Sequence, residues 1–271
     1  MYLQGNLSSV MFQMVWGYTL FGLTTAVALV LSFRRPESVW VKIVMVIGLI
    51  ISIFVSGAVG ALLGVQAARP FWHVGLFPVQ FPVFSLASGV AMMLVLLGFF
   101  APQDDPNRRQ QLWILSIASV VLLGIKLYFM WADYSQSIYG NVPMNVQAVN
   151  EVLFGPNWWA FWILQILVGS IIPIIVLVQP KLAKQGKISG WMGVLLLIGY
   201  AVARGLIIFP ALSIPELELL VQAFTGPHLT FYYFPSLMEW AVTLGAIGLA
   251  TLGVLLGSQY LPLFPDTSTE A

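Results

Sequence analysis

Seven apolar runs, each long enough to cross a lipid bilayer, dominate this sequence of 271 residues. A helix rises 1.5 Å per residue, so about 20 residues cross a hydrocarbon core of roughly 30 Å. Only 8% of the residues are charged, against roughly a quarter in soluble domains. We therefore expect an all-α integral membrane protein, one polytopic domain over residues 1–271, with spans near 9–33, 40–66, 79–100, 112–135, 157–178, 189–211 and 232–259.

Basic residues occur in alternate joints between these runs. The first, third and fifth joints contain Arg34, Arg35, Lys42, Arg108, Arg109, Lys181, Lys184 and Lys187. The second joint contains only Arg69, and the joints 136–156 and 212–231 contain no Lys or Arg. The positive-inside rule then predicts that the amino terminus is outside and the carboxyl terminus is cytoplasmic. The opening MYLQGNLSS lacks the basic start of a signal peptide, so we expect the first span to be retained.

The two longest joints, 136–156 and 212–231, both fall on the predicted outer side. They contain Glu151, Glu216, Glu218 and His228, and the segment IPELELLVQAF suits a short interfacial helix. Length and acidity favour a docking surface for another protein, and ordinary solvated loops are the alternative.

Composition excludes several kinds of site. With no Cys there is no disulfide, no thiolate metal ligand and no Cys-bound iron–sulfur cluster or covalently attached haem. Two His residues leave little for a bis-histidine haem, so we expect no metal, haem or iron–sulfur centre in this chain. The net charge of +1 comes from sparse charges and gives no support for nucleic acid binding.

Most polar side chains inside the predicted spans lie at a similar depth. Counting inward from the predicted outer ends places them roughly 10–12 Å below the outer face. The group consists of Tyr18, Ser56, Ser85, Ser88, Lys126, Gln165, Arg204 and Glu239. Charged groups inside a membrane are costly and often functional. This layer is either an ion cluster that fixes helix register or a polar cavity in which Glu239 exchanges a proton and hydroxyl and amide groups hold a head group.

Two further polar residues are ambiguous. Asp133 is seven residues beyond Lys126, on the same helix face, and either relays protons outward or is an interfacial aspartate solvated by the loop. His73, in ARPFWHVGLFPVQFP, lies just before the third span. It is either a proton carrier or head-group ligand, or only a polar residue at the membrane interface.

Three stretches resemble one family of membrane subunits. They are AARPFWHVGLFPVQFPVFSLASGVAMMLVLLG, LFGPNWWAFWILQILVGSIIPIIVLVQP and YYFPSLMEWAVTLGAIGLATLGVLLGSQYLPLF. Together they resemble the polysulfide reductase membrane-subunit family, which is NrfD-like and close to hydrogenase membrane anchors. The resemblance covers most of the chain from about Ser56 onward.

The resemblance implies a helical subunit of a respiratory complex in the cytoplasmic membrane of a prokaryote. Such a subunit exchanges electrons between the quinone pool, menaquinone or ubiquinone, and an iron–sulfur subunit docked on the outer face. That partner in turn binds a catalytic subunit: a molybdopterin enzyme, a hydrogenase or a multihaem cytochrome. Glu239 matches the acidic residue of the family's last-span motif, Arg204 its Arg in a G/A-x-x-x-R stretch, and His73 the polar position after P-F-W.

The sequence also departs from the family pattern. Family members usually have eight or more spans, and Val55 and Ser56 stand where relatives often place a His or another polar residue. Gln165 replaces an acidic residue in the FW-x-x-E pattern.

The resulting hypothesis is that a quinone head group enters the polar layer and is bound by Tyr18, Ser56, Ser88, Gln165, Arg204, Glu239 and His73, with Glu239, Lys126 and Asp133 exchanging protons. One alternative is a structural anchor without a quinone site. Another is a small-solute transporter, which would require an internal repeat and helices broken at mid-depth. No convincing repeat is visible.

Overall fold

The computed structural model describes residues 5–102, 106–215 and 233–260, and within these ranges it contains helices and no strand. The helices, in chain order, are α1 (Val10–Arg34), α2 (Val39–Gly64), α3 (Phe77–Phe99), α4 (Arg108–Tyr139), α5 (Pro143–Leu153), the π-helix η1 (Ala160–Ile171), α6 (Ile172–Leu177), α7 (Pro180–Ala183), α8 (Gly186–Ser213) and α10 (Leu237–Tyr260). In the described ranges seven helical segments are long and apolar enough to cross a membrane, with η1 and α6 forming one segment. The expected all-helical fold with seven spans is confirmed.

The largest difference from the predicted spans is at the start of the seventh. That helix begins at Leu237, five residues after the expected start near residue 232. Pro235 explains part of the delay, because a residue before proline is disfavoured in the helical region. Residues 233–236 therefore form a non-helical lead into α10.

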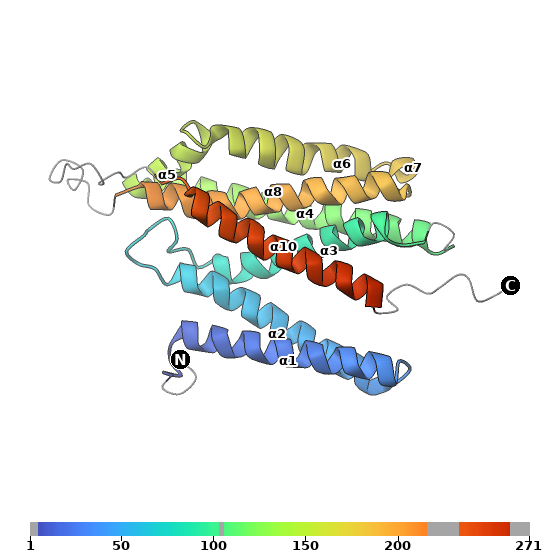
Figure 1. Ribbon diagram of the computed structural model, residues 1–271. Helices are drawn as coiled ribbons and strands as arrows, with labels where there is room; N and C mark the ends of the chain where they lie inside the picture. Colours follow the sequence, from blue (N-terminus) through green and yellow to red (C-terminus); the bar gives the residue numbers. More distant parts are fainter. Residues whose placement is uncertain (1–4, 103–105, 216–232, 261–271) are drawn as a thin grey trace.

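Helices α3 and α8 pack against each other in the middle of the molecule (Figure 1). α2 packs on α3, and α1 packs on α2, away from this centre. On the other side α3 contacts α4, and α8 contacts η1 and α6. The main core lies between these helices and contains Ala87, Ala91, Leu94, Leu112, Leu123, Leu177, Leu196 and Tyr200.

Glycines allow two of these contacts to be very close. Gly169 of η1 faces Gly199 of α8, and a methyl group on Gly199 would lie 2.6 Å from the Cα of Gly169. Gly60 of α2 packs directly on the backbone carbonyl of Phe77 at the start of α3. Small residues at such crossings let membrane helices approach, so that van der Waals contact holds them together.

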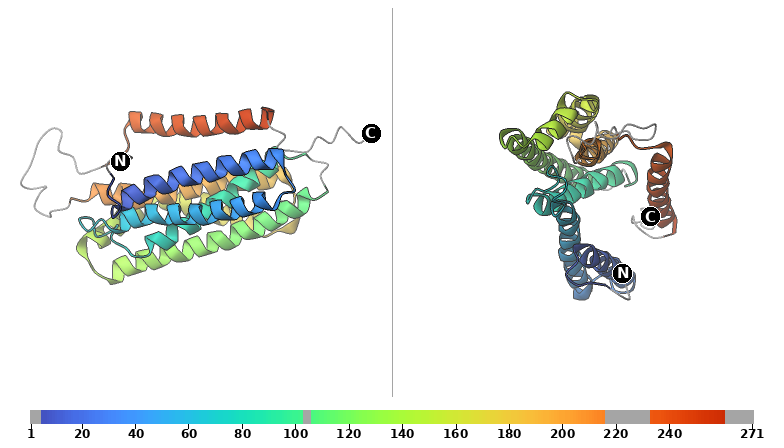
Figure 2. Two further views of the ribbon diagram at one scale, coloured as in Figure 1. Left: turned by 90° about the horizontal axis from the view of Figure 1, so that it is seen from below. Right: turned by 90° about the vertical axis from the view of Figure 1, so that its left-hand side faces the viewer.

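Helix α10 stands apart from the rest of the bundle. Figure 2 shows it separated from α1 and α2 and from the α3–α8 centre in both views. None of its most apolar window is buried. Its described connection is the lead before it: the Tyr233 amide donates to Ser213 Oγ at 3.2 Å, and the Tyr233 ring lies 5.9 Å from that of Phe209. The large apolar surface of α10 is therefore open.

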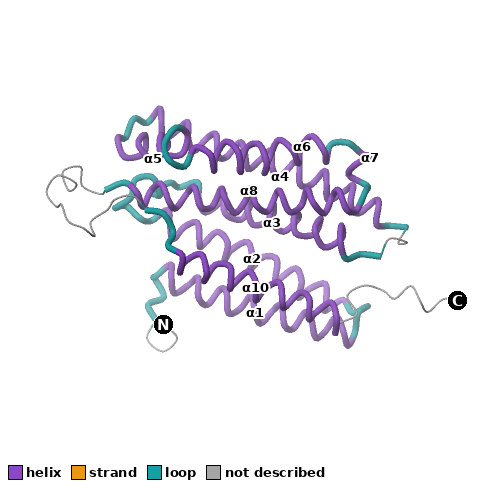
Figure 3. Tube along the Cα trace, turned by 45° about the horizontal axis from the view of Figure 1, so that its top comes forward, coloured by secondary structure: helices purple, strands orange, loops and turns teal. Residues whose placement is uncertain are grey.

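The joint expected as a long outer loop over 136–156 is mostly helical. α4 continues to Tyr139, the chain turns at Asn141 with a φ of 50°, and α5 follows. α5 buries Ala148, Val149 and Val152. Figure 3 shows α5 and α7 at opposite ends of the bundle, which agrees with joints that alternate between the two sides. Which end is outside stays a prediction, and residues 216–231, with Glu216, Glu218 and His228, lie outside the described residues.

Replacing Gly199 with alanine tests the close crossing of η1 and α8. We expect Gly199→Ala to destabilise the protein by about 1–3 kcal/mol, because the new methyl group overlaps Gly169 and forces the helices apart. Gly124→Ala in α4 is the control, since nothing lies within 4 Å of the position of its methyl group. Thermal unfolding of both variants in detergent measures the difference, and equal melting temperatures would contradict the close crossing.

Candidate functional site

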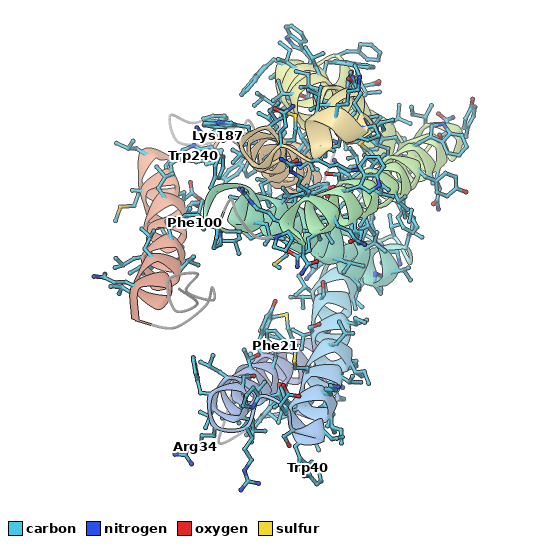
Figure 4. All side chains as sticks on the ribbon, turned by 90° about the vertical axis from the view of Figure 1, so that its right-hand side faces the viewer. Phe21, Arg34, Trp40, Phe100, Lys187 and Trp240 are labelled. Carbon is cyan, nitrogen blue, oxygen red and sulfur yellow. The ribbon has the colours of Figure 1, made fainter. Side chains whose placement is uncertain are left out.

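A cavity of about 480 Å³ opens between α1, α2, α3 and α8. Its walls are largely apolar, with Phe21, Val59, Leu62 and Phe81 among them. Figure 4 shows Phe21 on the side of α1 that faces the rest of the bundle. The polar side chains come from all four helices and are Tyr18, Ser52, Ser56, Ser85 and Arg204. Four residues expected in one polar layer, Tyr18, Ser56, Ser85 and Arg204, are thus brought together.

Hydrogen bonds link three of these helices across the cavity. The hydroxyl oxygens of Ser56 and Ser85 are 2.7 Å apart, which joins α2 to α3. Arg204 Nη2 donates to Ser85 Oγ at 3.5 Å, which joins α8 to α3. Among the described lining residues there is no Asp or Glu, and Arg204 is the one with a formal charge. A site of this kind favours a ligand with hydrogen-bond acceptors over a cation.

Local packing explains why these side chains reach the cavity. On α8, Ala203, Leu206 and Ile207 are buried, and Arg204 lies beside them with its side chain exposed. On α1, Gly17 packs against Val55 of α2, and the neighbouring Tyr18 projects into the cavity with about half of its surface (51%) exposed. The cavity therefore lies beside the contacts between the four helices, where the side chains next to the buried ones are no longer covered.

Lys126 belongs to a separate group of polar residues inside the bundle. It is fully buried, and its Nζ has no hydrogen-bond partner among the described residues. The Nζ lies 5.2 Å from the centre of the Tyr200 ring, which gives a cation–π contact. The Tyr200 hydroxyl is also buried without a partner in the described part of the chain. Buried polar groups of this kind are normally satisfied by internal water.

The buried face of α4 carries a row of polar residues. Residues on this face recur every three, four or seven positions, as a helical stripe requires: Leu112, Ser116, Ser119, Leu123, Lys126, Asp133 and Ser137. Ser116 Oγ and Ser119 Oγ have no partner among the described residues. Asp133 is two turns beyond Lys126 on this stripe, about 10 Å along the helix axis. Polar side chains thus follow most of the length of the span.

Gln165 lies with the Lys126 group and does not line the cavity. Its Nε2 donates to Met130 Sδ at 2.6 Å, and Met130 is one turn from Lys126 on α4. The side-chain amide oxygen of Gln165, Oε1, has no partner among the described residues. Gln165 also sits in the π-helix η1, where Ser170 Oγ donates to its backbone carbonyl at 2.8 Å. π-helical turns are rare and occur often at functional sites.

Glu239 lies in neither group, because it caps α10. Its carboxylate accepts from the Ser236 amide at 2.7 Å, from Ser236 Oγ at 2.8 Å and from the Tyr233 hydroxyl at 2.9 Å. The Glu239 backbone amide donates a hydrogen bond to Ser236 Oγ, which completes a capping box. The hydrogen bond to Glu239 raises the pKa of Tyr233, so that hydroxyl stays a donor. The depth expected for Glu239 was wrong: it lies in the first turn of its helix, not two turns inside.

His73 lies on an exposed turn between α2 and α3 and is not among the described residues that line the cavity between α1, α2, α3 and α8. The residues around it fasten this turn to the end of α8. Trp72 Nε1 donates to the Ile207 carbonyl at 2.8 Å, and Arg69 donates to the carbonyls of Ala211 and Ile214. The P-F-W motif thus has a structural role next to His73.

Ser88, also expected in the site, donates to its own helix at the Phe84 carbonyl, 2.7 Å away. Ser85, which lies at a comparable depth, is the serine of α3 that lines the cavity. Sequence reasoning did not single out Ser52 or Tyr200, nor Ser116 and Ser119 on α4. The spacing of Ser116, Ser119, Lys126 and Asp133, which are three, seven and seven residues apart and so share one helix face, was the available signal for the buried stripe.

Comparison with known proteins gives a match to the family model described as "Polysulphide reductase, NrfD", over residues 1–216. A selenate reductase subunit from Mesobacillus selenatarsenatis is 33% identical over 237 residues, 86% of this chain and 54% of that protein. The Hdr-like menaquinol oxidoreductase integral membrane subunit from Archaeoglobus fulgidus is 26% identical over 230 residues, 81% of this chain and 57% of that protein.

A third relative, the menaquinone reductase integral membrane subunit from Nitratidesulfovibrio vulgaris, is 25% identical over 232 residues, 81% of this chain and 53% of that protein. The chain thus spans about half the length of the curated relatives that it matches.

Replacing Lys126 with methionine tests whether its buried ammonium is compensated. We expect Lys126→Met to melt at the same temperature as the unaltered protein or higher, because an apolar side chain of similar size removes an unpaired buried charge. Leu123→Ala, one turn away and equally buried, is the control and should cost about 2–5 kcal/mol. A marked fall in the melting temperature of Lys126→Met would show that the ammonium has a stabilising partner.

Proposed function

Because the chain belongs to the NrfD family of polysulphide reductase membrane subunits, we propose that it is the quinone-reactive membrane subunit of a respiratory oxidoreductase. It would exchange electrons between the quinone pool and a redox partner, in the cytoplasmic membrane of a prokaryote. Two relatives have menaquinol or menaquinone in their names, which favours menaquinone over ubiquinone.

The observation that carries the proposal is the hydrogen-bonded set of Arg204, Ser85 and Ser56 at an otherwise apolar cavity. A quinone has two carbonyl oxygens that accept hydrogen bonds, on a flat ring with an apolar tail. The cavity offers donors from the guanidinium and hydroxyls, apolar walls for the ring and a volume of about 480 Å³. Sites for small molecules usually measure about 300–1,000 Å³, so the residues present fit such a head group.

Each polar residue of the cavity has a distinct task in this proposal. Arg204 donates to one carbonyl oxygen and stabilises negative charge that develops there during reduction. Ser85 accepts a hydrogen bond from the guanidinium and is itself hydrogen-bonded to Ser56, so the set links α8 to α2 through α3. The Tyr18 hydroxyl, which is partly exposed, donates from the α1 side. Quinol oxidation supplies two electrons and two protons.

We assign proton exchange with the cavity to Lys126 and Asp133. None of the described residues that line the cavity is Asp or Glu, so we infer that the protons move through other groups. Tyr200, which contacts Lys126, is one turn from Arg204 on α8, so the buried group and the cavity are neighbours on one helix. Asp133 extends the buried stripe of α4 toward the predicted outer end. Gln165 supports this group through Met130.

Glu239 and His73 fit positioning roles better than roles at the head group. Glu239 already accepts three hydrogen bonds as the cap of α10. His73 is exposed on the turn fastened to α8 and suits the surface at which a partner docks.

The proposed partner is an iron–sulfur subunit on the outer face, joined to a catalytic subunit such as a molybdopterin enzyme, a hydrogenase or a multihaem cytochrome. The start of α5 and the turns beside it supply a candidate contact. A surface hollow there is lined by Asn141, Pro143, Val146, Gln147, Asn150, Glu151, Phe154 and Gly155. Its amides, its carboxylate and the exposed Phe154 suit a protein partner.

Two serines one turn apart on α3 provide a matched test of the quinone site. We expect Ser85→Ala to raise the KM for a soluble menaquinol analogue several-fold, because Arg204 loses its hydrogen bond to the wall of the cavity. Arg204→Gln should weaken quinone binding about 10–100-fold, the cost of losing a charged donor. Ser88→Ala is the control and should leave quinol-linked turnover of the assembled complex unchanged, because Ser88 bonds only to its own helix. Unchanged turnover in all three variants would contradict the quinone site and support the alternative that the chain is a structural anchor.

A second pair of variants separates the two roles of Glu239. We expect Ser236→Ala to lower the melting temperature, since a lost N-cap costs about 1 kcal/mol, and Glu239→Gln to keep near-normal turnover, since glutamine preserves the capping box. Melting curves and quinol-linked turnover of the assembled complex measure both effects. A large loss of turnover in Glu239→Gln with an unchanged melting temperature would instead assign proton exchange to this carboxylate.

A further inference from the structure

A second, strongly basic hollow lies at the opposite end of the bundle from α5. Its volume is about 460 Å³, and it is lined by Arg108, Arg109, Pro180, Lys181, Lys184, Gln185 and Gly186. Figure 4 looks onto this end of the molecule, where Phe100 at the end of α3 and Lys187 at the start of α8 are labelled. Four cationic side chains thus surround one small volume.

Arg108 is fixed in place and forms the base of this hollow. Its Nε donates to the Leu97 carbonyl at 3.2 Å and its Nη2 to the Gly98 carbonyl at 3.0 Å, at the carboxyl end of α3. Gly186 packs directly on the same guanidinium and leaves no room for a side chain. The arginine is therefore positioned before any ligand binds.

The other three cations have no protein partner within the described residues. Arg109, Lys181 and Lys184 are exposed, and their side chains make no hydrogen bond or ion pair to any part of the chain that the structure describes. Four like charges at one hollow repel each other, and an anion between them relieves the repulsion. The start of α8 adds backbone donors, because its N-cap residue Gln185 makes no side-chain cap bond.

Two tryptophans near the hollow mark the expected level of the membrane interface. Trp113 is one turn into α4, and Trp191 lies one turn into α8 with its ring 5.7 Å from that of Phe99. Tryptophans at span ends mark the membrane interface. The basic joints at this end also predict that it faces the cytoplasm, where the leaflet is rich in anionic lipid.

We propose that the hollow binds the phosphate head group of an anionic phospholipid of the inner leaflet. Four positive charges match a lipid with two phosphates, such as cardiolipin, better than one with a single phosphate. Arg108 and Arg109 would hold phosphate oxygens from α4, and Lys181 and Lys184 would close the site from α7 and the turn after it. This proposal is independent of the quinone site.

Native mass spectrometry of the full chain, released from nanodiscs that contain cardiolipin, phosphatidylglycerol or phosphatidylethanolamine, tests this site. We expect retention of cardiolipin above phosphatidylglycerol and no retention of phosphatidylethanolamine. The double variant R109Q/K184Q should bind cardiolipin about 30-fold more weakly, because each basic residue near a membrane surface contributes about fivefold.

The matched control is R34Q/K42Q, which removes two exposed cations from another basic joint that does not line the hollow. Cardiolipin binding by this variant should equal that of the unaltered chain. If both double variants lost cardiolipin binding equally, the effect would come from the overall charge of the protein, and the proposal would be overturned. Melting curves of both variants check that they are folded. If R109Q/K184Q does not fold, the lipid preference of the unaltered chain decides the test by itself.

Two other outcomes would also overturn the proposal. Displacement of cardiolipin by inorganic pyrophosphate at a comparable concentration would assign the hollow to a soluble phosphate. Absence of any retained lipid on the unaltered chain would mean that the positive charge is balanced within the protein, for example by Asp104 and Asp105, which precede α4 outside the described residues.

Discussion

The packing of α8 against α3 is the contact on which both polar groups depend. It lies at the centre of the molecule, with α1 and α2 on one side and α4, η1 and α6 on the other. Gly199 permits the close crossing with η1 on one side of α8, and Arg204, little more than one turn later, faces the cavity. A single helix therefore connects the buried stripe of α4 with the exposed cavity. A shift of α8 would move Tyr200 relative to Lys126 and Arg204 relative to Ser85 at the same time.

The buried Lys126 has an energetic consequence. An unpaired ammonium inside a protein is costly, and the contact with the Tyr200 ring compensates only in part. The same bundle also buries the hydroxyls of Ser116 and Ser119 on α4, and the side-chain amide oxygen of Gln165 on η1, without protein partners in its described part. A core selected for stability alone would place apolar side chains at these positions. Their presence along one face of α4 favours a role in proton exchange.

The spans could be predicted from the sequence because hydropathy over some 20 residues depends little on detail. Depth within a span was also useful, since Tyr18, Ser56 and Arg204 do share a cavity. Rotation about the helix axis could not be deduced from depth. Ser85 and Ser88 differ by one turn, yet only Ser85 lines the cavity. Lys126 and Arg204 were expected at comparable depths, yet Lys126 is buried against Tyr200 and Arg204 lines the cavity. For Glu239 the signal was present and not used: Ser236 and Glu239 have the spacing of a capping box.

The exposure of Arg204 limits what can fill the cavity. A guanidinium that faces hydrocarbon inside a membrane is costly, by about 2.5 kcal/mol or more at the centre of a span. Its described side-chain hydrogen bond, to Ser85, is long at 3.5 Å and offsets only part of that cost. Lipid tails offer no acceptor, so water or a ligand with acceptor oxygens is the stable neighbour of Arg204. A quinone head group meets this requirement and also covers the apolar wall formed by Phe81 and Ile207, which water does not stabilise.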